Sequence, residues 1–78
     1  MEFIEWLQKE KNYKEKTSHD VVSRLKRVKQ FLGSVDEPIE ALNRIESNKD
    51  FKCLTHSVRS QLRKALRLYD EYQKLNCL

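Results

Sequence analysis

The sequence contains few residues that interrupt helices and no long apolar run. Its 78 residues include one glycine, Gly33, and one proline, Pro38, so few breaks are expected. No apolar stretch approaches the roughly 20 residues that a membrane-spanning helix needs. The first ten residues, MEFIEWLQKE, carry acids where a signal peptide would carry basic residues before an apolar centre. The sequence therefore predicts a protein without membrane contact that resides in the cytoplasm.

Cysteine is also scarce, with only Cys53 and Cys77, and in a reducing compartment both are expected to be free thiols. Cys53 and His56 have C-x-x-H spacing, and Cys77 and His19 could add ligands. A structural zinc site needs four ligands, however, and a second closely spaced pair is missing. A Cys53 nucleophile beside His56 would lack an orienting acid. We therefore expect no metal, no cofactor and no enzyme within these residues.

The composition fits one small all-α domain that comprises residues 1–78. The hydrophobic fraction is 38% and the charged fraction is 36%, and the apolar residues recur at helical spacing rather than being scattered. A chain of this length can bury only a modest core, which leaves no room for a large enclosed active site. Neither an internal repeat nor an interior linker divides the chain.

Four helices are expected, and their ends carry recognisable signals. Thr17 can cap the second helix in a capping box with Asp20, and Gly33 can close its far end. Pro38 suits the first turn of the third helix, because its missing donor costs little there. The expected helices cover residues 2–10, 17–33, 36–47, and from Thr55 or Ser57 to about Asn76. The loops between them, 11–16 and 48–54, are expected to be irregular.

Each expected helix has one apolar face. The side chains expected to point inward are Phe3, Ile4 and Leu7; Val21, Leu25, Val28 and Leu32; Ile39, Leu42 and Ile45; Phe51 and Leu54; and Val58, Leu62, Leu66 and Tyr69. We expect the second and fourth helices to be neighbours, because each long helix must cover its apolar stripe.

Basic residues are confined to two segments. Residues 9–30 carry eight Lys or Arg against three acids, and residues 51–69 carry five Lys or Arg and no acid. An exposed helix face usually neutralises its charges with acids three or four residues away, and here the last helix offers none between Lys52 and Tyr69. Arginines on one helix face repel one another, so such a face favours binding of an external anion. The planar guanidinium group matches phosphate because it can donate two hydrogen bonds to it.

The order of several motifs resembles the amino-terminal core-binding domain of phage-integrase-type tyrosine recombinases, also called the SAM-like integrase domain. Its F-x-x-W-L opening corresponds to Phe3, Trp6 and Leu7, and its K-T loop end to Lys16 and Thr17. The pattern of its second helix corresponds to Ser23, Leu25, Val28, Phe31 and Leu32, and that of its last helix to Val58, Arg59, Ser60, Leu62, Arg63, Leu66, Arg67 and Tyr69. Asp20 departs from the family, since many relatives have a neutral residue or tyrosine there.

The resemblance implies a four-helix SAM-like orthogonal bundle whose second and fourth helices lie across double-stranded DNA. Such a domain forms half of a clamp, and the catalytic arginines, histidines and nucleophilic tyrosine belong to a carboxy-terminal recombinase domain in cis. Tyr69 and Tyr72 are at core spacing and are predicted to be packing residues. The candidate DNA-contacting residues are Lys16, Thr17, His19, Ser23, Arg24, Arg27, His56, Arg59, Ser60, Arg63, Lys64 and Arg67.

Two interpretations of function remain open. The chain is either a fragment of a recombinase or a free-standing relative without catalysis, and in both cases it is expected to be a monomer in isolation. The alternative is a small helical interaction protein, such as a phage-encoded inhibitor, whose basic face binds an acidic protein or a nucleic-acid complex. Both interpretations draw on the same charge pattern.

Overall fold

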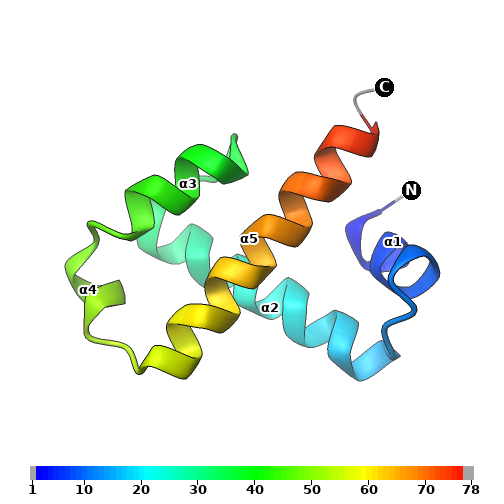
Figure 1. Cartoon of the computed structure of the whole chain (residues 1–78), viewed down its shortest axis with the longest axis horizontal. Helices are drawn as coiled ribbons and strands as arrows, with labels where there is room; N and C mark the ends of the chain where they lie inside the picture. Colours follow the sequence, from blue (N-terminus) through cyan, green and yellow to red (C-terminus); the bar gives the residue numbers. More distant parts are fainter. Residues whose placement is uncertain (1, 77–78) are drawn as a thin grey trace.

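The computed structural model describes residues 2–76, which form five helices and no strand within that range. The helices are α1 (Phe3–Glu10), α2 (Glu15–Leu32), α3 (Pro38–Ile45), α4 (Lys49–Lys52) and α5 (His56–Asn76). The two long helices, α2 and α5, cross each other, with α1 beside the start of α2 and with α3 and α4 towards its other end (Figure 1). The all-helical class expected from the sequence is confirmed, and the described residues contain one more helix than expected.

The core consists of two adjoining clusters of buried side chains, and α5 contributes to both. The first cluster lies between α2, α3, α4 and α5 and contains Leu25, Val28, Val35, Ala41, Ile45, Phe51, Leu62 and Leu66. The second cluster lies between α1, α2 and α5 and contains Trp6, Leu7, Val21, Ala65 and Leu68. The predicted contact between the two long helices is confirmed, and Tyr69, which was expected to be buried, is half-buried beside the first cluster.

The start of α2 differs from the expectation. The helix begins at Glu15, its N-cap position is Lys14 without a side-chain cap, and Thr17 and Asp20 lie within the helix as exposed residues. The predicted capping box is therefore wrong. Asn12, with φ of 54°, turns the chain before the helix, and Ser18 is buried with its Oγ donating to the Lys14 carbonyl at 3.0 Å. Packing of this first turn extends the helix towards its amino end.

The end of α2 follows the prediction. Gly33 has φ of 85°, a conformation that costs glycine little, and its N–H donates to the Lys29 carbonyl at 2.7 Å. At the other long helix, Thr55 is confirmed as a cap, because its Oγ1 accepts a hydrogen bond from the Val58 N–H at 3.3 Å.

The register of α3 also differs from the expectation. Pro38 occupies the first turn as predicted, but Ile39 is 49% exposed whereas Ala41 is 2% exposed. Pro38, Ala41 and Ile45 are the buried residues of α3, and the helix packs on α5 and α2. Ile39 is consequently left on the surface.

The segment after α3 contains a short helix where an irregular connection was expected. The Asn48 side chain accepts a hydrogen bond from the Phe51 N–H at 3.0 Å and thereby caps α4. Phe51 is 1% exposed, which confirms its inward position, and Leu54 is half-buried. Burial of the phenylalanine ring in the first cluster holds this single turn in place.

Candidate nucleic-acid interface

A surface groove lies between α2 and α5 and is polar and basic on its α2 side. It is lined by Asp20, Ser23, Arg24 and Arg27 from α2 and by Val58, Gln61 and Leu62 from α5. Ser23 and Arg27 are exposed and Arg24 is half-buried, and the Arg27 guanidinium lies 6.0 Å from the ring centroid of Phe31. The groove therefore presents two guanidinium groups, a hydroxyl and a side-chain amide to solvent, with one carboxylate among them.

The arginines of α5 do not line this groove. Arg63 forms a bidentate ion pair with Glu46, with Nε to Oε1 at 2.5 Å and Nη2 to Oε2 at 3.0 Å. Its guanidinium also lies 5.5 Å from the ring centroid of Phe51, and its side chain is only 23% exposed. We call the row formed by Arg59, Arg63 and Arg67 on α5 the α5 stripe. The sequence predicted that this stripe lacks a neutralising acid. That prediction is wrong for Arg63, because Glu46, at the carboxyl end of α3 and 17 residues away in the chain, pairs with it.

Glu46 interacts electrostatically with all three arginines of the α5 stripe. The hydrogen bond from Arg63 is the largest influence on the Glu46 carboxyl and lowers its pKa below the usual range. Burial, the next largest influence, opposes this shift, and the positive charges of Arg63, Arg59 and Arg67 add to the lowering. The same hydrogen bond raises the pKa of the Arg63 guanidinium. Arg59 is half-buried and its Nε has no hydrogen-bond partner within the described residues, whereas Arg67 is exposed. One carboxylate thus faces three guanidinium groups, which leaves the stripe positively charged.

The remaining predicted site residues lie on the surface of both long helices. His19 Nε2 is 3.8 Å from Glu15 Oε1 and is mostly exposed. The others are exposed side chains, namely Lys16, Thr17, His56, Ser60 and Lys64. The structure thus gathers the predicted residues into two surfaces: the α2/α5 groove with Ser23, Arg24 and Arg27, and the α5 stripe around Glu46 with Arg59, Arg63 and Arg67.

Sequence reasoning missed Gln61 and Glu46 as members of these surfaces. Gln61 lies two residues from Arg59 and Arg63, so on a helix it points away from both of them and towards the groove. Glu46 lies in residues 34–50, a segment with five acids and two basic residues, and that local excess of carboxylates was the available signal that an arginine would find a partner there.

No metal centre is formed within residues 2–76, since no group of three or more His, Cys, Asp or Glu side chains lies close enough to share an ion. Cys53 is an exposed free thiol, and Cys77 lies outside the described residues. Within the described part of the chain, no helix has the length and apolarity needed to cross a bilayer. Comparisons of the chain with models of protein families, with curated proteins and with solved structures find no match.

Proposed function

We propose that the chain is a duplex-DNA-binding domain that contacts phosphates through α2 and α5, in the manner of the core-binding domain of a tyrosine recombinase. The observation that carries the proposal is the α2/α5 groove, where Arg24 and Arg27 stand beside the amino-terminal half of α5. Guanidinium groups donate paired hydrogen bonds to phosphate oxygens, and such contacts position a protein on DNA without reading sequence.

The amino-terminal turn of α5 supports the same surface. α5 has 21 residues and no acid in its first turn, where His56 and Ser57 are exposed. The positive end of the helix dipole favours a phosphate at this end, where the Val58 N–H already donates to Thr55 Oγ1. Because the α5 residues that line the groove belong to its first two turns, this end and the arginines of α2 can contact neighbouring phosphates of one strand.

The cations available to DNA are fewer than the sequence suggests. Arg63 uses Nε and Nη2 on Glu46, so its role is to hold α5 against the carboxyl end of α3. The cations that remain near the groove and along α5 as far as Arg67 are the exposed Lys16, Arg27, Lys64 and Arg67 and the half-buried Arg24. If about four or five of them release counterions, log affinity falls with log salt concentration with a slope of about −4.

The test is duplex binding measured by fluorescence anisotropy over a series of salt concentrations. Arg24→Gln/Arg27→Gln should weaken binding about tenfold or more at low salt and make the slope shallower by about 2. Lys49→Gln/Lys52→Gln on α4 removes the same charge away from the groove and is the matched control. If the control variant loses as much affinity, the effect comes from net charge and not from the groove. If the wild-type chain does not bind duplex DNA at low salt, the result favours an acidic protein as the partner.

A further inference from the structure

A second groove, here called the aromatic groove, lies between α1, α2 and the carboxyl half of α5. Phe3, Tyr69 and Tyr72 form its aromatic wall. The ring centroids of Phe3 and Tyr69 are 5.2 Å apart, those of Phe3 and Tyr72 are 5.3 Å apart, and those of the two tyrosines are 6.1 Å apart. All three rings are half-buried, so an apolar surface is open to solvent at this position.

The opposite wall of the aromatic groove is basic. Lys26, Lys29 and His19 of α2 line it and are exposed, and the acid among the lining residues is Glu2. The Nζ of Lys29 lies 5.8 Å from the ring centroid of Tyr69, so a cation already covers that ring. An occupant that matches this groove brings an aliphatic side chain for the rings and carboxylates for the two lysines.

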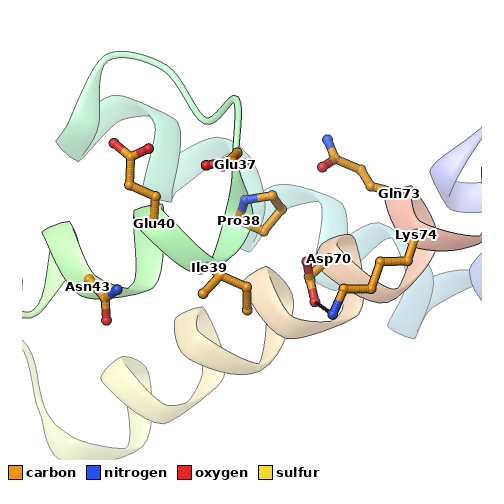
Figure 2. Close-up of a pocket in the computed structure, with 8 residues that line it drawn as sticks. All are labelled: Glu37, Pro38, Ile39, Glu40, Asn43, Asp70, Gln73 and Lys74. Carbon is orange, nitrogen blue, oxygen red and sulfur yellow. Dashed lines mark ion pairs between the residues drawn. The ribbon is translucent and has the colours of Figure 1, made fainter. Parts of the chain in front are cut away.

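The outward side of α3 has this chemistry. Ile39 is the exposed aliphatic residue of that helix, at 49%, and Glu37, Glu40 and Asn43 are exposed around it. Figure 2 shows Ile39 projecting from α3 towards α5 and Glu40 projecting from the other side of α3 in this view; Asp70, Gln73 and Lys74 of α5 line the groove opposite α3. Within the described residues neither Glu37 nor Glu40 forms an ion pair. We call Glu37, Ile39, Glu40 and Asn43 the acidic ridge.

We propose that the acidic ridge of one copy of this chain binds in the aromatic groove of a second copy. Ile39 would lie against the rings of Tyr69 and Tyr72, and the two glutamates would face Lys26 and Lys29. The ridge and the groove are different surfaces of the same molecule, so the contact is head to tail and can be repeated along a row of copies. This inference concerns self-association and does not depend on the proposed binding of DNA.

The contact is weak by its size. One aliphatic side chain and two exposed ion pairs form a surface well below the roughly 1,200 Å² of a stable complex. The chain therefore remains monomeric at micromolar concentration, and copies associate only when they are concentrated, for instance by a shared template. Because the ion pairs are exposed, salt weakens the association.

Sedimentation equilibrium of the full chain without nucleic acid, from micromolar to millimolar concentration, tests the proposal. At low salt the average mass should rise with concentration, and added salt should suppress the rise. Lys26→Glu/Lys29→Glu and Glu37→Lys/Glu40→Lys should each weaken self-association at least tenfold, and an equimolar mixture of the two variants should restore it. Circular dichroism confirms that each variant is folded.

Two further variants separate this contact from general charge effects. Lys49→Glu/Lys52→Glu carries the same charge change as Lys26→Glu/Lys29→Glu but lies outside both surfaces, so it should self-associate like the wild type. When mixed with Glu37→Lys/Glu40→Lys, it should restore association no more than the wild type does. Ile39→Ser should weaken association without altering charge. The proposal is overturned if the wild type stays monomeric at millimolar concentration, if the control mixture rescues equally, or if Ile39→Ser associates normally.

Discussion

Arg63 and Arg67 stand four residues apart on α5, yet their guanidinium groups have different surroundings. Arg63 binds Glu46 in a bidentate manner and covers the ring of Phe51, whereas Arg67 is exposed. We expect Arg63→Gln to lower the thermal midpoint of unfolding and Arg67→Gln to leave it unchanged, as monitored by circular dichroism. Equal midpoints for the two variants would show that the ion pair adds nothing to stability.

The same ion pair makes stability depend on pH in a defined direction. The pKa of the Glu46 carboxyl is lower in the folded chain than its reference value of 4.5. The unfolded state therefore binds the proton more tightly, so the ion pair contributes stability above the reference value and loses it as the pH falls through the lower, folded value. We expect the advantage of the wild type over Glu46→Gln to shrink as the pH falls from neutral to below the reference value of 4.5 in urea unfolding experiments. A difference that is constant across this range would contradict the assignment.

At the level of the helices, α5 carries the largest share of the core. Leu62 is 1% exposed in the first cluster, and its replacement by alanine removes buried methyl groups and leaves a cavity. We expect Leu62→Ala to reduce the free energy of unfolding by about 2 to 4 kcal/mol in urea titrations of dilute protein. Ile39→Ala, at an exposed position, should change it by no more than about 0.5 kcal/mol. If the two substitutions cost the same, α5 packs in a different register.

The long helices were predictable from the sequence because their apolar faces repeat over several turns. Leu25 and Val28 on α2, and Leu62 and Leu66 on α5, recur at a spacing that only one helical register places together. α3 has only two turns, and its sequence offers two candidate inward faces, Ile39, Leu42 and Ile45 or Pro38, Ala41 and Ile45. In so short a helix, packing against α5 decides which residue is buried, and a local pattern does not contain that information.

The candidate site was predictable only in part. Exposed cations on one face of α2 follow from helical spacing, and the groove that contains Arg24 and Arg27 agrees with that expectation. The pairing of Arg63 with Glu46 joins residues 17 positions apart in the chain, and it arises only when α3 packs on α5. A search for acids at three- or four-residue spacing cannot detect such a partner.

For the whole molecule, the two clusters of the core should unfold together. Trp6, the one tryptophan, is 3% exposed in the second cluster, whereas helix content reports mainly on α2 and α5. Because α5 supplies Leu66 to the first cluster and Leu68 to the second, loss of either cluster exposes this helix. We expect tryptophan fluorescence and far-ultraviolet circular dichroism to give coincident urea transitions. An earlier fluorescence transition would show that α1 detaches separately.

The position of α5 in both clusters also affects how the chain folds during synthesis. Trp6 and Leu7 are synthesised before their buried neighbours Ala65 and Leu68, which leave the ribosome about 60 residues later. Until then α1 and α2 have no complete surface on which to pack, and their apolar faces stay exposed to chaperones and to other nascent chains. Contacts between residues so distant in sequence also slow folding relative to bundles of the same size with local contacts. A ribosome stalled before α5 has emerged should therefore hold a chain that proteases cleave readily, and release of α5 should make it resistant.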